Sequence, residues 1–280
     1  MTQTLQPKQR ISSIDALRGF SLIGIVLLHC MEHFDLTSYP EYTSELMQKI
    51  DTIVYDVIRF FVQGKSYAIF SMLFGLSFFI QHDNQAQQGV DFRPRFLWRM
   101  VLLMLFGLFD LLFYNGDILT VYAVCGVLVV PFIRASNKVL VAATIIFALQ
   151  PIELTYIIMG LIDPSTQPLD LGSGALFEGI LPAQSEGTIF DVAAKGIENG
   201  FLVIYFCAIE HGRATQTIFL FLLGIYLGRK RLFYDEGNNI ETWKRILVAS
   251  LCAFVVLFPL YDAVHDIVKE IPNADRTCVQ

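Results

Sequence analysis

Long apolar runs, separated by short polar segments, dominate this chain. Several of the runs approach the roughly 20 residues that an α-helix needs to cross a bilayer. They predict an all-α protein: a polytopic transmembrane helical bundle with about seven membrane-spanning helices plus interfacial helices, in a single transmembrane domain over residues 1–280. The predicted spans are 17–34, 60–81, 96–114, 117–133, 139–161, 212–228 and 246–262.

Three segments between the spans have other patterns. In residues 35–59, apolar side chains recur every three or four positions opposite Asp51 and Asp56, which predicts an amphipathic helix along the outer membrane interface. Residues 162–197 are rich in proline and glycine and predict a long outer loop with short helices. The apolar stretch 201–210 is too short to span a bilayer alone, so we expect a re-entrant piece there.

The first apolar run carries a stripe of ionisable side chains. Arg18 and His29 are eleven residues apart, which on an α-helix places them about 20° apart around the axis and about 16 Å apart along it. Asp15 precedes Arg18 by one turn, and His33 follows His29 by one turn. Such groups are unfavourable in contact with lipid, so the stripe must face protein or a water-filled cavity. It is the first candidate for a functional site.

Composition narrows the class of protein. The chain is 54% hydrophobic and 16% charged, with a mean hydropathy of +0.54, which excludes an ordinary soluble domain. Its five cysteines have no CxxC spacing and lie mostly in apolar runs, so neither a disulfide framework nor a zinc site is indicated. No nucleic-acid signature is present, and we expect no nucleic-acid partner. The first apolar run has no small-residue cleavage site, so we expect it to be retained.

The distribution of basic residues predicts the orientation in the membrane. With a cytoplasmic N-terminus, thirteen of the 20 lysines and arginines fall in inner segments, whereas the outer loops are acidic. This arrangement follows the positive-inside rule and predicts a multi-pass protein whose N-terminus is cytoplasmic. The inner basic residues are Lys8, Arg10, Arg18, Arg93, Arg95, Arg99, Arg134, Lys138, Arg229, Lys230, Arg231, Lys244 and Arg245.

His29 and Arg18 are the candidate catalytic residues. The pKa of a neutral imidazole lies near working pH, so His29 could take a proton from an acceptor hydroxyl that attacks a thioester. Arg18 presents a planar fork of N–H donors suited to the phosphates of a coenzyme A donor. Simpler interpretations remain open for both residues. Arg18 could fix the topology from the cytoplasmic interface, and His29 could bond a neighbouring helix.

Four further residues are candidate substrate-binding groups. Asp15 could orient Arg18, and His33 continues the stripe beyond His29. Lys65 could bind an anionic acceptor or pair with Asp56. Asp117 heads a predicted helix, where capping of free N–H groups is at least as well supported as catalysis.

Two other polar patterns have weaker support. His29, Glu32 and His33 match HxxEH, in which two histidines bind zinc and the glutamate acts as a base. No third ligand is evident, so we expect no metal. A second polar cluster on the outer side could hold an acceptor: Glu210, His211 and Arg213.

Four segments in order carry a resemblance to a known family. They are RISSIDALRGF from Arg10, GKSYAIFSMLFGLSF from Gly64, GDILTVYAVCGVL from Gly116 and FLLGIYLGR from Phe221. The chain resembles the YeiB-like family of bacterial inner-membrane proteins, a domain-of-unknown-function family within the transmembrane acyltransferase superfamily. That superfamily includes the membrane O-acyltransferases of the acyltransferase-3 type and the lysosomal heparan-α-glucosaminide N-acetyltransferase.

The resemblance implies a reaction and a location. An acyl group, such as acetyl, would pass from cytoplasmic acyl-CoA, the donor substrate, to a periplasmic or lipid-linked acceptor at the outer face of the bacterial inner membrane. In the acyltransferase-3 type, ten residues separate an arginine from a histidine, and Arg18 and His29 match this spacing. YeiB-like members often carry asparagine in place of that histidine. The family pattern continues with further membrane helices, and that block is missing before Gln280; a partner or a homo-oligomer could supply it.

Two other classes of function stay open. In the first, a small-solute or proton-coupled transporter or binding protein, the polar stripe would line a path without a covalent step. Transporters often carry broken helices at matched positions of two repeats, and no such repeat is visible in this sequence. In the second, the chain would be a non-catalytic assembly partner in a larger membrane complex.

Overall fold

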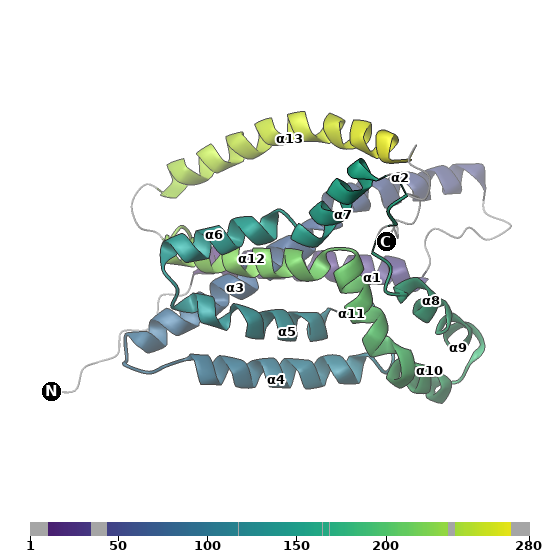
Figure 1. The fold of residues 1–280 in the computed structure, drawn as a ribbon, viewed down its shortest axis with the longest axis horizontal. Coiled ribbons are helices and arrows are strands. Elements are labelled where there is room, and N and C mark those ends of the chain that lie inside the picture. Colours follow the sequence, from purple (N-terminus) through teal and green to yellow (C-terminus); the bar gives the residue numbers. More distant parts are fainter. Residues whose placement is uncertain are drawn as a thin grey trace.

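The computed structural model describes residues 11–34, 44–116, 118–163, 165–167, 169–234 and 239–269, and for residues 32–34 and 261–269 it describes the backbone alone. Every regular element in these ranges is helical, which confirms the all-α class for them (Figure 1). The elements in chain order are α1 (Ser12–Phe34), α2 (Glu45–Phe61), α3 (Lys65–Ala86), α4 (Arg93–Asp110), α5 (Leu119–Val129), η1 (Val130–Ile133), α6 (Asn137–Ala148), α7 (Pro151–Ile162), α8 (Ser173–Glu178), α9 (Leu181–Glu186), α10 (Ile189–Lys195), η2 (Gly196–Gly200), α11 (Phe201–Glu210), α12 (Arg213–Arg229) and α13 (Asn239–Lys269).

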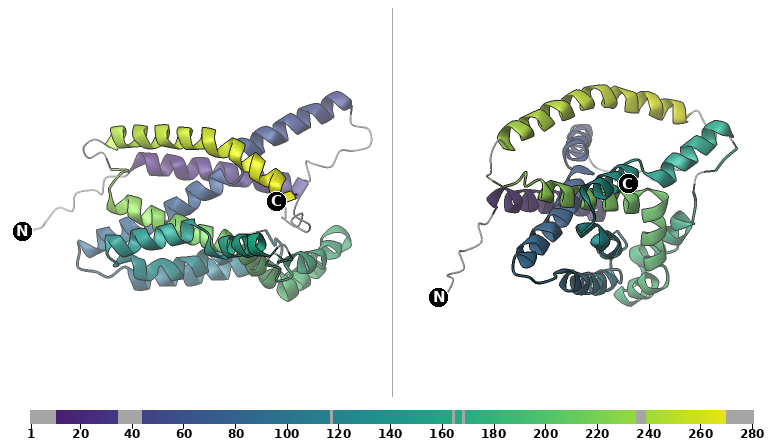
Figure 2. Two further views of the ribbon diagram at one scale, coloured as in Figure 1. Left: turned by 45° about the horizontal axis from the view of Figure 1, so that its top comes forward. Right: turned by 60° about the vertical axis from the view of Figure 1, so that its left-hand side comes forward.

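The centre of the bundle is the parallel pair α3 and α12. Tyr67 near the start of α3 lies beside Thr217 near the start of α12, and Phe79 further along α3 lies beside Gly228. The two helices therefore run in the same direction. α5 and α6 pack against α12, α4 packs against α5, and α1 packs against the other side of α3 (Figures 1 and 2).

Glycine allows α3 and α12 to approach closely. A Cβ atom at Gly75 would overlap the carbonyl oxygen of Phe221, and one at Gly224 would overlap the carbonyl oxygen of Met72. Small residues at such positions are typical of helix contacts in membrane proteins, where backbones come together through van der Waals packing. Each glycine is therefore part of the tightest backbone contact between the two helices.

Aromatic side chains fill the space between α3, α5 and α12. Tyr122 of α5 is 1% exposed, and its ring lies against Phe70, Phe74 and Phe221 with centroids 6.1, 5.8 and 5.2 Å away. Edge-to-face and offset contacts of this kind add to the burial of apolar area. The Tyr122 hydroxyl also bonds the side chain of Ser71, which joins α5 to α3 through a polar contact inside an apolar core.

Basic side chains gather at one end of the bundle, where α3, η1 and α12 end and α4 and α6 begin. Asp91 pairs with Arg93 at 2.7 Å and with Arg134 at 3.3 Å, and Arg231 approaches Asp83 at 3.8 Å. These basic residues come from segments that the sequence assigns to one side of the membrane, and the structure does place them together. That this end faces the cytoplasm stays a prediction.

The predicted span 139–161 is not one straight helix. It is divided into α6 and α7, which meet at an angle of 48°. Gln150 between them has φ of 46° and ψ of 70°, in the left-handed region, and Pro151 begins α7. Proline disfavours the helical conformation of the residue before it, which explains the break.

The described residues do not show all seven of the predicted membrane spans. Three stretches are long and apolar enough to cross a membrane, namely Ser12–Met31, Ile189–Glu210 and Asn239–Leu260, and α6 with α7 would make a fourth. Helices α3, α4 and α12 do occupy three of the predicted positions. However, α4 carries three arginines within 18 residues, and α12 has 17 residues with an arginine at each end.

The predicted loop 162–197 does contain short helices, α8 and α9, but its last part and the piece 201–210 belong to one longer helical segment. Helices α10, η2 and α11 run on from one another over Ile189–Glu210, which is 22 residues and long enough to span a membrane. The loop therefore ends before Ile189. Thr188 caps α10 because its side chain accepts from the backbone of Asp191, whose carboxylate accepts from Thr188 in return.

Two helices lie at the periphery. In α2 no residue is buried, and the Asn239–Leu260 part of α13 is 0% buried. Figure 2 shows α13 arching away from the other helices. The two peripheral helices meet through Phe60, whose ring lies 6.2 Å from Phe254 and 6.3 Å from Phe258. An amphipathic helix is thus present over Glu45–Phe61, and its position at the outer interface stays a prediction.

Candidate functional site

Helix α1 presents its polar stripe from a fixed position on α3. At Gly24 the two helices come so close that a Cβ atom would overlap the Ser66 hydroxyl oxygen and lie 2.9 Å from the side chain of Val62. His29 lies five residues beyond Gly24, about 7.5 Å along the axis, so it is level with the turn between α2 and α3. Arg18 lies six residues before Gly24, so it is level with the middle of α3.

Arg18 is held by two neighbours. Its guanidinium donates to the carboxylate of Asp15 at 3.1 Å and to the hydroxyl of Ser77 on α3. The side chains of Arg18 and Asp15 are 38% and 35% exposed, so the pair lies at the surface of the packed bundle. The predicted role of Asp15 in orienting Arg18 fits this contact. The guanidinium has more N–H donors than these two bonds use, which leaves capacity for an anionic ligand.

His29 faces the segment that follows α4. Its Nδ1 lies 2.8 Å from the hydroxyl of Tyr114, and the two rings meet edge to face with centroids 5.3 Å apart and an angle of 86°. Tyr114 was not among the residues that the sequence singled out. It lies 85 positions along the chain from His29, and nothing local to either residue indicates the pairing.

The hydrogen bond to Tyr114 determines what His29 can do. If Nδ1 carries the hydrogen and donates to the phenol oxygen, Nε2 holds the lone pair and can accept a proton. If the phenol donates instead, Nε2 carries the hydrogen. The neighbour of Tyr114, Asn115, is 6% exposed, and its Oδ1 has no hydrogen-bond partner within the described part of the chain.

Lys65 lies at the start of α3, beside a hollow in the surface. We call this the α2–α3 hollow; it has a volume of about 400 Å³, and Asp56, Arg59 and Gln63 also line it. The Lys65 ammonium lies 5.3 Å from the ring centroid of Phe60. Among the described residues it makes no ion pair, so the pairing with Asp56 is not observed, although both side chains line the same hollow.

Two of the predicted substrate-binding groups lie outside what the structure describes. Asp117 is outside the described residues, and for His33 only the backbone within α1 is described. Their roles stay predictions, and so does the zinc alternative that depends on His33. Among the described side chains, no group of three histidine, cysteine, aspartate or glutamate residues could hold a metal ion.

In the second polar cluster, Glu210 and His211 form hydrogen bonds within the protein. Glu210 accepts hydrogen bonds from the backbone N–H groups of Leu171 and Ser173 and from the Ser173 hydroxyl, which holds the chain entering α8. His211 Nδ1 lies 2.9 Å from the carbonyl oxygen of Cys207, one turn earlier. An acceptor site at this cluster is therefore not supported by its hydrogen bonds.

Two hollows in the surface, one between α2 and α3 and one between α6 and α12, are lined by neither Arg18 nor His29. The imidazole and the guanidinium instead meet different neighbours, the Tyr114 segment and α3. A path between them would have to open along the contact of α1 with the bundle.

Comparison with known proteins places this site in a family. The family described as heparan-alpha-glucosaminide N-acetyltransferase, catalytic, matches residues 10–165. The chain belongs to this family. The matched segment contains Arg18, His29, Lys65 and Tyr114, and therefore both ends of the imidazole–phenol contact. The family and the apolar helices together indicate a membrane protein.

Two bacterial relatives of this N-acetyltransferase-family chain are uncharacterized. An uncharacterized 39.9 kDa protein in the amylase 3′ region of Bacillus acidopullulyticus is 29% identical over 207 residues, which is 71% of this chain and 56% of the relative. The uncharacterized protein YxaH of Bacillus subtilis (strain 168) is 28% identical over 271 residues, which is 89% of this chain and 66% of the relative. The chain thus spans between about half and two thirds of these relatives. No solved structure matches it.

Proposed function

We propose that the protein is a membrane-bound acyltransferase that moves an acyl group, such as acetyl, from cytoplasmic acyl-CoA to an acceptor at the outer face of the bacterial inner membrane. The observation that carries the proposal is the contact between His29 Nδ1 and the Tyr114 hydroxyl at 2.8 Å, inside the segment that matches the N-acetyltransferase family. The finer assignment to the YeiB-like branch depends on the four sequence motifs and is part of the proposal.

His29 would act as the general base. With Nδ1–H donating to Tyr114, Nε2 takes the proton from the acceptor hydroxyl or amine as its oxygen or nitrogen attacks the thioester carbon. The carbon–sulfur bond then breaks, and the proton passes from Nε2 to the departing thiolate, which leaves as coenzyme A thiol. No other reactant is needed. Tyr114 would be a positioning residue that selects the reactive tautomer of His29.

Arg18 would bind the phosphate-bearing part of the donor. Its separation from His29 along α1, about 16 Å, suits an extended molecule whose phosphates and thioester lie far apart. Asp15 holds the guanidinium from one side. Lys65, Asp117 and His33 are kept as candidate groups for the acceptor, since Lys65 lines a surface hollow at the level of His29.

The test uses membranes that contain the full chain and radiolabelled acetyl-CoA. Label in washed lipid and glycan extracts and release of coenzyme A thiol are both measured. A general base typically contributes about 10²–10⁴-fold, so His29→Ala should lower both signals by at least about a hundredfold at equal protein level. His211→Ala is the matched control because this histidine bonds its own helix and should keep full activity.

Tyr114→Phe separates positioning from packing, because it keeps the ring and removes only the hydroxyl. Loss of one hydrogen bond of about 1 kcal/mol predicts a roughly fivefold lower kcat and a changed pH profile on the acid side, with KM for acetyl-CoA unchanged. Transfer that persists in His29→Ala would remove His29 from the mechanism. Absence of transfer in the unmodified protein, with uptake that depends on a proton gradient, would favour a transporter instead.

A further inference from the structure

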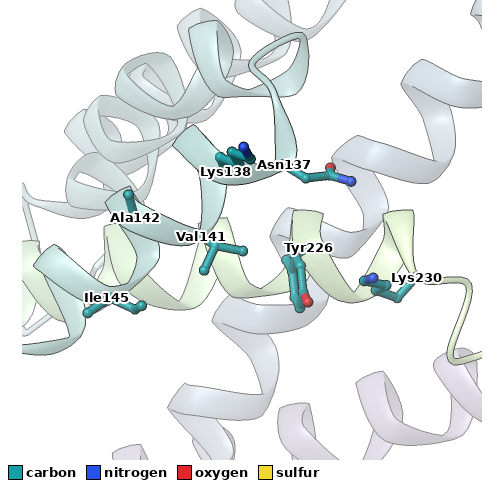
Figure 3. Close-up of a pocket in the computed structure, with 7 residues that line it drawn as sticks. All are labelled: Asn137, Lys138, Val141, Ala142, Ile145, Tyr226 and Lys230. Atoms are coloured by element: carbon teal, nitrogen blue, oxygen red, sulfur yellow. The ribbon is translucent and has the colours of Figure 1, made fainter.

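A groove between α6 and α12 opens at the basic end of the bundle. Its volume is about 460 Å³, and Figure 3 shows the residues that line it. Lys138, Val141, Ala142 and Ile145 line one wall at the spacing of a single helix face, and Tyr226 of α12 lines the other. From Lys138 to Ile145 the wall extends about 10 Å along α6, roughly two thirds of the hydrocarbon thickness of one leaflet.

The polar end of the groove has two lysines without acidic partners. Lys138 of α6 and Lys230 of α12 both line it, and among the described residues neither has a carboxylate within ion-pair distance. Lys230 lies over the ring of Tyr226, with 5.7 Å to its centroid. The neighbouring arginines, in contrast, have acidic partners: Arg134 pairs with Asp91, and Arg231 approaches Asp83. Within the described part of the chain, the groove therefore carries two positive charges that no ion pair offsets.

Arg229 fixes the position of both walls. Its guanidinium donates to the Asn137 side-chain oxygen at 2.7 Å and to the carbonyl oxygens of Phe132 and Ile133 at 3.0 and 3.1 Å. These bonds tie the end of α12 to the turn that precedes α6. The backbones that carry the two lysines are thus held together without a ligand, so the polar end of the groove is preformed.

We infer that this groove binds one anionic phospholipid, with the phosphate at Lys138 and Lys230 and an acyl chain along Val141, Ala142 and Ile145. The charge favours an anion, and the apolar wall runs from the lysines along α6, away from the basic end of the bundle, as a lipid tail requires. Basic pockets between membrane helices bind anionic headgroups in this way. A soluble phosphate compound would use the lysines but gain nothing from the apolar wall. The inference depends on insertion in a membrane and not on acyl transfer.

The experiment measures binding of phosphatidylglycerol to the full chain in neutral detergent by native mass spectrometry, with phosphatidylethanolamine as the zwitterionic comparison. The Lys138→Gln, Lys230→Gln variant should bind phosphatidylglycerol about thirtyfold more weakly, since each lysine near a headgroup contributes about a factor of five. Lys244→Gln, Arg245→Gln is the matched control. It removes two basic residues at the start of α13, outside the groove, and should bind as the unmodified chain does.

Filling the groove tests the lipid against a soluble anion. Ala142 is exposed, so Ala142→Trp should fold normally, keep both lysines and lose phosphatidylglycerol binding. Equal binding of both lipids by the unmodified chain would overturn the inference. So would displacement of phosphatidylglycerol by inorganic phosphate or coenzyme A with no effect of Ala142→Trp, because the groove would then be an anion site. A loss in the Lys244→Gln, Arg245→Gln control equal to that in the groove variant would overturn it too.

Discussion

Replacing Gly224 by alanine should separate the central helices α3 and α12. The new Cβ atom would lie 2.7 Å from the backbone nitrogen of Leu76 and closer still to the carbonyl oxygen of Met72. Ordinary contacts between such atoms are about 3.5 Å, so the backbones must move apart by roughly 0.8 Å or more. Neither atom belongs to a flexible side chain that could turn away.

The size of the effect follows from that displacement. A gap of about 0.5–1 Å forfeits a quarter to a half of the dispersion attraction between facing atoms, and α3 and α12 form the most extensive helix contact in the bundle. Overpacking in a core typically destabilises by about 1–3 kcal/mol, and a clash with backbone places Gly224→Ala near the upper end. For a chain of this size, that corresponds to a melting temperature lowered by roughly 6–10 °C.

The assay is thermal unfolding of the purified full chain in detergent, followed by intrinsic fluorescence. Gly160→Ala is the matched control, because a Cβ atom there meets nothing within 4 Å and alanine is the better helix former. It should melt at or slightly above the temperature of the unmodified chain. Gly75→Ala should resemble Gly224→Ala, and the double variant should lose less than the sum, since both act on one contact. A Gly224→Ala protein as stable as the unmodified chain would refute the reasoning.

Three further predictions concern polar contacts. Tyr122→Phe removes a buried hydroxyl contact between α5 and α3 and should lower the unfolding free energy by about 0.5–1 kcal/mol in chemical denaturation; an unchanged value would show that the contact is not stabilising. Hydrogen bonds from Arg93, its side chain first and its backbone second, hold the pKa of Asp91 below its ordinary value. The stability that this carboxylate contributes is therefore complete above about pH 4 and is lost as the pH falls further, so melting curves of Asp91→Asn should depend less on pH in that acid range. Glu210→Ala leaves the N–H groups of Leu171 and Ser173 and the Ser173 hydroxyl without their acceptor, and limited proteolysis should cut that turn faster than in Glu210→Gln.

Most of the helices could be predicted from the sequence because helical periodicity is local. The runs that become α1, α3, α4, α5 and α12 are visible as apolar stretches, with ends shifted by a few residues. The break at Gln150 also had a local signal, since Pro151 follows it, but the apolar run on both sides concealed it. The helical segment Ile189–Glu210 was missed because two glycines and several polar residues interrupt it before Phe201.

Only the part of the candidate site on α1 could be predicted from the sequence. The spacing of Arg18 and His29 on one helix face is a property of the sequence, whereas their partners are not. Ser77 lies 59 positions from Arg18 and Tyr114 lies 85 from His29, and pairings at such separations are set by how the helices pack. The same limit applied to Gly75 and Gly224. Nothing local to either glycine indicates that α3 and α12 contact each other.

Helix α1 connects two anchoring points with a stiff rod. An α-helix of 23 residues is about 34 Å long, and it turns about its axis as one body. Arg18 is attached to Ser77 near one end, and His29 to Tyr114 near the other. Because this rod is also packed against Ser66 at Gly24, a ligand that displaces α1 at Arg18 should strain the contact between His29 and Tyr114 at its other end.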